Sequence, residues 1–280
     1  MTRSLPALAF FGVCMVAILL GAGMLSGFAP IALRPLASGI VASAGLLALS
    51  LAFLRREGRD ARSAGLHVGP GSGARLAAGA AIGFFLYGLY LLLLAGLAGG
   101  TVEAGAGADV GAIALAVATY SELASMEELG FRGYALRRLE ERFGRFVALV
   151  AGAVAFGVLH LAYGWPLGAA MIGAMSGALL FGMGALVTRG LAVPIGLHAA
   201  WNLGGWSVGE KDGAGLWRLV VPEQGAAAST VSYLVVMGIG ILGFWYVGRR
   251  RVVAPSAGAA AASRDQQEVP AVVPGDPAER

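Results

Sequence analysis

Long apolar runs separated by short charged clusters dominate this 280-residue chain. Hydrophobic residues make up 58% of the sequence and charged residues 13%, whereas a soluble globular domain usually carries about 25% charged residues. The mean hydropathy is +0.76. A backbone in contact with lipid must satisfy its own hydrogen bonds, and helices do so within one segment. The sequence therefore predicts an all-α fold, a polytopic bundle of transmembrane helices.

Eight apolar runs approach the length of about 20 residues that a helix needs to cross a bilayer. They are Pro6–Phe28, Ala37–Leu54, Leu76–Leu97, Gly111–Gly133, Phe146–Tyr163, Pro166–Val187, Leu191–Val208 and Val231–Val247. The first run is alternatively a signal peptide, because Arg3 precedes it and small residues follow it, although it is long for one. We expect about eight spans.

The arginines predict how the chain is oriented. With a cytoplasmic N-terminus, the inside loops hold most of them: Arg55, Arg56, Arg59, Arg62, Arg75, Arg137, Arg138, Arg142, Arg145, Arg189, Arg249, Arg250 and Arg251. The outside loops then hold only Arg34, Lys211 and Arg218, among acidic residues. Cytoplasmic loops are the ones enriched in Lys and Arg, so both termini are predicted to be cytoplasmic.

The net charge of +4 does not indicate nucleic-acid binding, because the arginines lie at the ends of apolar runs rather than along one aromatic-rich face. We expect the lipid bilayer as a partner and no nucleic acid. Arginine far outnumbers lysine, which is typical of a GC-rich genome and indicates a bacterial inner membrane. The single cysteine, Cys14, excludes disulfides within the chain. The segment 252–280 lacks apolar periodicity and is predicted to be a disordered cytoplasmic tail.

Ionisable residues inside spans cost roughly 2.5–3.5 kcal/mol each on insertion scales, so they need partners, a water-filled cavity or a function. Glu127, Glu128 and Arg132 lie late in the fourth run. The i,i+4 spacing of Glu128 and Arg132 lets them pair on one helix face. Glu127 points about 100° away from Glu128 around the helix, so its carboxylate remains available to accept a proton. The alternative is that all three lie at the cytoplasmic interface and extend toward water.

Two further runs carry polar side chains at i,i+4 spacing. Phe156 precedes His160 by one helical turn and could form a wall beside the imidazole. His198 and Asn202 share a helix face and could act on one polar atom. Packing and hydrogen bonding between helices are the alternatives for each motif taken alone. One shared, water-containing cavity would relieve the burial cost of all these residues together. The Gly173 and Gly177 pair indicates close helix packing and no chemistry.

In order along the chain, the three motifs Glu-Glu-x-x-x-Arg, Phe-x-x-x-His and His-x-x-x-Asn resemble those of the CPBP family of intramembrane proteases. This family includes CAAX prenyl endopeptidases of the Ras-converting type and bacteriocin-processing or self-immunity proteins. The resemblance covers about Gly111 to Val208. It divides the chain into N-terminal helices with a cytoplasmic loop (1–110), a catalytic core (111–208), an extracytoplasmic loop with the last helix (209–251), and the tail (252–280).

The resemblance implies peptide-bond hydrolysis by a glutamate-activated water. By position, the catalytic residues would be Glu127 and His160, which activate the water, and His198 and Asn202, which stabilise the oxyanion. Glu128, Arg132 and Phe156 would be supporting residues. The implied substrates are membrane-associated peptides or proproteins, of CAAX type or otherwise. No cofactor is implied.

Two alternatives remain. The glutamates and histidines could bind zinc, although the chain lacks an HExxH motif. The protein could instead be a non-enzymatic scaffold, an immunity factor or a proton-coupled transporter, since carriers also use intramembrane carboxylates. No inverted repeat relates the two halves of the chain, which disfavours a carrier.

Overall fold

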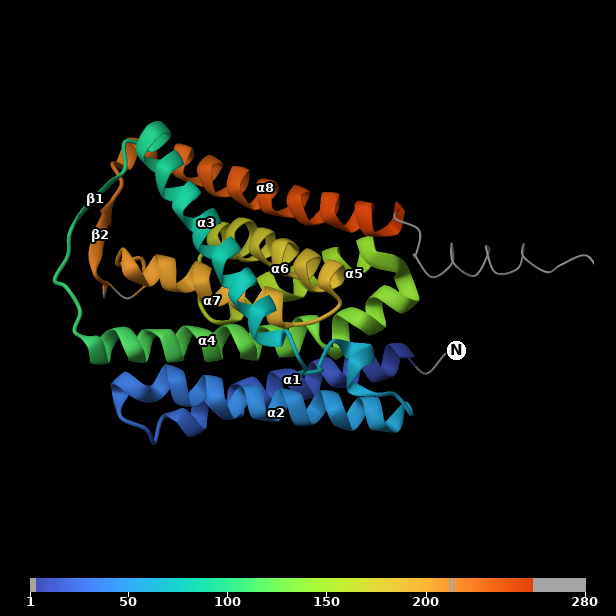
Figure 1. Ribbon diagram of the computed structural model, residues 1–280. Coiled ribbons are helices and arrows are strands. Elements are labelled where there is room, and N and C mark those ends of the chain that lie inside the picture. The colour runs from blue at the N-terminus through green and yellow to red at the C-terminus, as the bar shows by residue number, and fades with distance from the viewer. Residues whose placement is uncertain (1–3, 212, 214, 254–280) are drawn as a thin grey trace, which may run out of the picture.

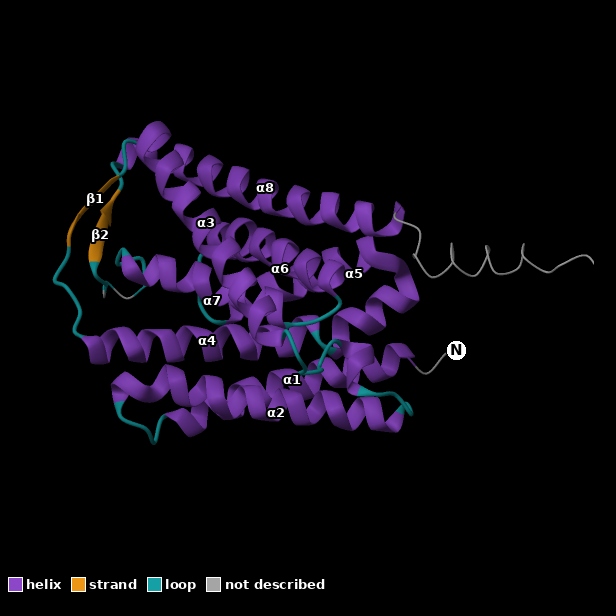
Figure 2. Ribbon diagram, viewed as in Figure 1, coloured by secondary structure: helices purple, strands orange, loops and turns teal. Residues whose placement is uncertain are grey.

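The computed structural model describes residues 4–211, 213 and 215–253. Of the predicted tail 252–280, residues 252 and 253 belong to the last helix, and residues 254–280 lie outside the described residues. The helices are α1 (Ser4–Ser26), α2 (Arg34–Arg56), α3 (Ser72–Ala98), α4 (Val110–Arg132), α5 (Tyr134–Ala162), α6 (Met175–Thr188), α7 (Ala192–Ser207) and α8 (Ala226–Val253). Figures 1 and 2 show that they run back and forth between the two ends of one bundle. The predicted all-α polytopic bundle is confirmed.

Within the described residues, six helical segments are long and apolar enough to cross a membrane. The run Val110–Ala162 counts as one of them and contains both α4 and α5, whereas α7 has only 16 residues. Large apolar side chains also face outward, for example Phe85, Leu92 and Phe146. Outward apolar chains on apolar helices belong in lipid, so this is an integral membrane protein.

The helix α5 begins at Tyr134 and has two parts, of which the second agrees with the predicted fifth span from Phe146. Gly144 has φ 81°, which interrupts the helix, so residues 134–143 form a separate first part. Arg137 and Arg138 in this part are buried. Arg137 pairs with Glu140 and Arg138 with Glu141. Because these ion pairs replace contacts with water, the segment packs as a helix although its charges are typical of a cytoplasmic loop.

Helices α3 and α7 pack through glycines. A Cβ atom on Gly79 or Gly83 would overlap the carbonyl oxygens of Val193 and Leu197, and one on Gly196 would overlap that of Leu76. Only glycine permits two helix backbones to approach so closely. This contact fixes the backbone of α7 immediately before and after His198.

The two ends of the bundle differ. We call one the basic face, formed by residues 55–71, 133–145 and 189–191 on the right of Figure 1. The other is the hairpin face, formed by residues 27–33, 99–109, 163–168, 208–211 and 215–225. There β1 (Thr101–Ala104) and β2 (Trp217–Val220) pair antiparallel, with Thr101 opposite Val220. The sequence predicted only loops in these two segments.

Candidate active site

The four proposed catalytic side chains line one cavity of about 420 Å³. Glu127 comes from α4, His160 from α5, and His198 and Asn202 from α7. Residues up to 75 positions apart in the sequence thus meet at one place. The expectation that these polar residues share a cavity is confirmed.

The predicted pair of Glu128 and Arg132 is present and buried. Arg132 Nη1 lies 3.1 Å from Glu128 Oε1, and their side chains are 3% and 0% exposed. The alternative, in which these side chains extend into water at the membrane interface, is therefore wrong for this pair. Two charges of opposite sign at this distance relieve much of the cost of burying either one.

Aromatic rings complete the surroundings of Arg132. Its guanidinium carbon lies 4.6 Å from the ring centre of Phe156 and 5.6 Å from those of Phe131 and Phe181. Arg132 Nη2 also donates a hydrogen bond to the carbonyl oxygen of Ala178 at 3.3 Å. Cation–π contacts and hydrogen bonds together stabilise a guanidinium that has no access to water.

His198 lies between the two glutamates. Its Nδ1 is 3.0 Å from Glu128 Oε1, and its Nε2 is 3.6 Å from Glu127 Oε2. An ionised carboxylate only accepts hydrogen bonds, so Nδ1 donates to Glu128. Phe181 stacks on the imidazole, with ring centres 4.1 Å apart and planes 16° apart. These contacts fix the ring and direct Nε2 toward Glu127.

His160 is held by its own helix. Its Nδ1 lies 2.9 Å from the carbonyl oxygen of Phe156, which can only accept, so Nδ1 donates and Nε2 carries the other role. The predicted wall beside the imidazole is confirmed, because the ring centre of Phe156 lies 4.4 Å away. Trp165 packs against the ring edge-on at 4.5 Å.

Small and aromatic residues form the remaining walls. Gly173 and Gly177 line the cavity, and a Cβ atom on Gly173 would meet nothing within 4 Å. The prediction that this pair marks close helix packing is therefore wrong at Gly173, which instead leaves space. Gly173 belongs to η3, a π-helical turn (Ala169–Ala174) that leads into α6. Such turns are frequent at functional sites.

Several contributors to this site were not predicted from the sequence. Glu128 was expected to pair only with Arg132, whereas it also binds His198. Phe181, Trp165 and Lys211, which line the cavity, were not expected there. Lys211 is the only lysine in the chain, which was a possible signal. A lone aromatic residue in an apolar helix gives no such signal, because packing is its usual role.

No three His, Cys, Asp or Glu side chains are grouped so as to hold a metal ion, within the part of the chain that the structure describes. The site residues present two carboxylates, two imidazoles and one carboxamide. Such a set can accept a proton, donate hydrogen bonds and stabilise a developing negative charge.

Comparison with known families gives one match. Residues 109–204 match the family described as type II CAAX prenyl endopeptidase Rce1-like. The comparison with curated proteins gives no match. The matched region covers α4 to α7 as far as Gly204, and it contains all three motifs. Over residues 109–204, the chain is similar to the CPBP/CAAX family of membrane proteases.

Proposed function

We propose that this protein is an intramembrane endopeptidase that hydrolyses peptide bonds with a water molecule activated by Glu127. The observation that carries the proposal is the convergence of Glu127, His160, His198 and Asn202 on one cavity among apolar helices. A scaffold does not need a hollow at the place where these four side chains meet.

In the first step, the Glu127 carboxylate takes a proton from water, and the water oxygen attacks the carbonyl carbon of the substrate. His160 is the second group suited to orient this water, because its Nδ1 is bound to the Phe156 carbonyl and its Nε2 is the nitrogen left for another partner. A positioned general base contributes about 10²–10⁴-fold to such a reaction.

The tetrahedral intermediate carries its negative charge on the former carbonyl oxygen. The Asn202 amide can donate to this oxygen, and so can His198 Nε2 when the ring is an imidazolium. Removal of one such donor costs about 3–4 kcal/mol in other hydrolases. Collapse of the intermediate breaks the C–N bond, and protonated Glu127 returns its proton to the leaving amine. The products are a carboxylic acid and an amine, which ionise to a carboxylate and an ammonium group, and no covalent intermediate forms.

Glu128 and Arg132 act through His198 in this scheme. Glu128 binds Nδ1 of the imidazole, and Arg132 balances the charge of Glu128. A carboxylate behind a histidine fixes the orientation of the ring. These two residues are therefore positioning residues.

The substrates that fit are peptides or proteins associated with the membrane, because the cavity lies among helices that stand in lipid. The family description names CAAX prenyl endopeptidases. A prenylated C-terminus is one form that a membrane-associated substrate can take, and the reaction above does not require it.

The test compares Glu127→Gln with Glu122→Gln. Both residues belong to α4, but the Cβ of Glu122 lies beside Gly39 of α2, away from the cavity. Membranes containing each variant are compared by quantitative proteomics of new peptide termini. We expect the termini made by the wild-type protein to persist with Glu122→Gln and to disappear with Glu127→Gln. Termini that persist with a folded Glu127→Gln protein would contradict the proposal. A proton-coupled carrier would generate no such termini at all.

A further inference from the structure

The rim of the cavity lies on the hairpin face. Pro35 lies in the first turn of α2 there, Trp165 lies in the connection between α5 and η3, and Lys211 follows α7. Pro35 and Trp165 are exposed and Lys211 is half-buried. Glu127 and His198 form the inner part of the same cavity. The hollow thus runs from the reacting groups to the hairpin face.

Neighbouring hollows extend the cavity on the same side. One, of about 530 Å³, shares Pro35, Thr119 and Tyr120 with it and reaches residues 106–109 before α4. Another, of about 420 Å³, shares Ala169, Gly173 and Tyr233 with it and lies beside the first turns of α8. A chain that approaches from the hairpin face therefore meets a continuous set of depressions that lead to Glu127.

The opposite direction is closed. Toward the basic face, Glu127 is followed by Glu128, Arg132 and Tyr134, with exposures of 0%, 3% and 0%. The aromatic rings of Phe131, Phe156 and Phe181 fill the space around Arg132. Arg132 binds Glu128 there, and the Tyr134 hydroxyl donates a hydrogen bond to Glu57.

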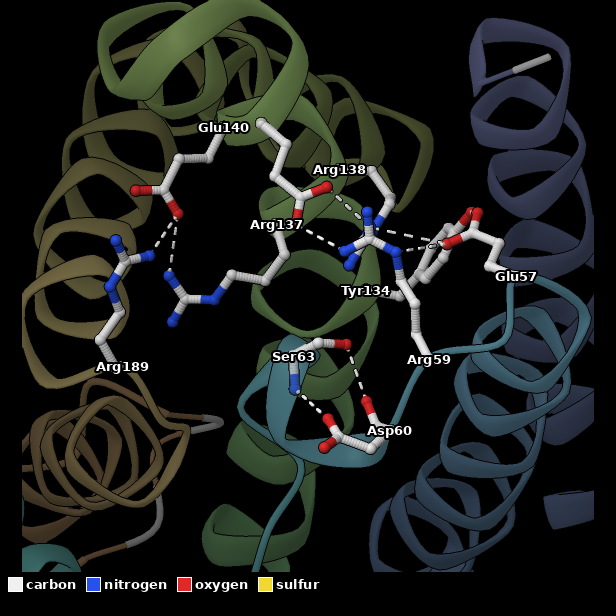
Figure 3. Close-up of polar contacts among 10 residues, drawn as sticks. Glu57, Arg59, Asp60, Ser63, Tyr134, Arg137, Arg138, Glu140 and Arg189 are labelled. Atoms are coloured by element: carbon white, nitrogen blue, oxygen red, sulfur yellow. Dashed lines mark hydrogen bonds and ion pairs between the residues drawn. The ribbon is translucent and has the colours of Figure 1, made fainter. Parts of the chain in front are cut away.

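On the basic face, ion pairs join segments that are distant in sequence, as Figure 3 shows. Glu140 of α5 lies 2.7 Å from Arg189, which follows α6, and 3.1 Å from Arg137. Glu141 lies 2.9 Å from Arg59 of the α2–α3 connection and 2.7 Å from Arg138. This network connects α5 to the α2–α3 connection and to Arg189 at the end of the bundle that carries the arginines.

We propose that the catalytic cavity opens only away from the basic face, so that this protease cleaves peptide segments on the extracytoplasmic side of the membrane. The assignment of sides follows from the enrichment of arginine in cytoplasmic loops. The inference rests on the proposed function, and it names the substrate class: an apolar peptide segment at the outer surface of the membrane, not a cytoplasmic C-terminus.

The chemistry of the walls agrees with an apolar segment. Tyr120, Trp165, Trp201, Tyr233 and Met237 line the cavity together with small residues. Aromatic surfaces bind apolar side chains through burial and ring contacts. The hollows beside α2 and α8 open next to membrane-spanning helices. A substrate segment anchored in the membrane can therefore enter the cavity without leaving the bilayer.

The first test maps the opening without any catalysis. Cys14, the only cysteine, is replaced by serine, and single cysteines are introduced at Thr119 inside the cavity, Gln224 on the hairpin face and Ser63 on the basic face. A membrane-impermeant maleimide is added to right-side-out and to inside-out vesicles. We expect Thr119→Cys to be labelled from the same side as Gln224→Cys and from the opposite side to Ser63→Cys.

Labelling of Thr119→Cys from the side of Ser63→Cys would overturn the proposal. So would labelling only after detergent is added, because the cavity would then be closed on both sides. These outcomes do not depend on Glu127, so they are separate from a failure of the proposed function.

The second test locates the cleavage sites. New peptide termini that depend on Glu127 are placed on the known topology of the proteins from which they come. We expect them at extracytoplasmic positions, beside or just within apolar segments. Termini at cytoplasmic C-termini would overturn the assignment of sides even though they would support peptide hydrolysis.

Discussion

Two groups of charged residues use the same Glu–Arg chemistry in different ways. In the cavity, Glu128 has one arginine and one histidine as partners, and all three side chains are at most 7% exposed. On the basic face, Glu140 has three arginine partners, of which Arg189 is 64% exposed. If one side chain of the buried group is removed, water cannot take its place. If one arginine of the basic face is removed, Glu140 keeps two other arginine partners and is close to water. The Glu–Arg pair in the cavity thus positions the imidazole of His198, whereas the pairs on the basic face connect separate segments of the chain.

The largest effect should follow from Arg132→Met. This change leaves the Glu128 carboxylate buried without its counter-ion, which costs about 3–5 kcal/mol when one partner of a buried pair is lost. We expect a large drop in the unfolding temperature in detergent and in the yield of folded protein. Arg218→Met is the matched control, because the pair of Arg218 with Glu103 is exposed and should contribute about 0–1 kcal/mol. Equal stability of the two variants would remove the distinction between the two groups.

The contrast also shows what the sequence could reveal. The helices were predictable because apolar runs of this length have few other folds, and the Glu128–Arg132 pair was predictable from its i,i+4 spacing. The burial of the helix at 134–143 was not predicted, because Arg137 and Arg138 are typical of a hydrated segment until their contacts with Glu140 and Glu141 are known.

The contact between Glu128 and His198 could not be predicted from the sequence for another reason. The two residues are 70 positions apart and belong to helices whose relative rotation depends on packing. The close approach of α3 and α7 at Gly83 and Gly196 sets this rotation, and a glycine in an apolar run does not reveal its neighbour. The strands β1 and β2 were missed similarly, since each has only four residues.

A smaller effect is expected from Glu140→Gln. The change weakens contacts with Arg137, Arg145 and Arg189, but Arg189 and Arg145 can turn toward water. We expect a loss of about 1 kcal/mol or less per pair in unfolding experiments. Cleavage per folded molecule should stay at the wild-type level. A large loss of activity in folded protein would show that the basic face takes part in the chemistry.

No effect is expected from removal of metals. Activity on a model peptide, measured after exhaustive chelation, should equal that of untreated protein if Glu127 activates the water directly. Loss of activity that returns with added zinc would contradict this and would recast His160 and His198 as ligands.

The most direct measurement compares the two adjacent glutamates in both readouts at once. Purified Glu127→Gln and Glu128→Gln proteins are assayed for thermal unfolding and for peptide cleavage. Glu127→Gln keeps the shape of the side chain but cannot accept the proton, so we predict unchanged unfolding and turnover lower by about 10²–10⁴-fold. Glu128→Gln weakens the hold on both Arg132 and His198, so stability should fall and turnover should drop about 10–100-fold, as for other carboxylates that orient a histidine. A folded Glu127→Gln protein with wild-type turnover would contradict the account.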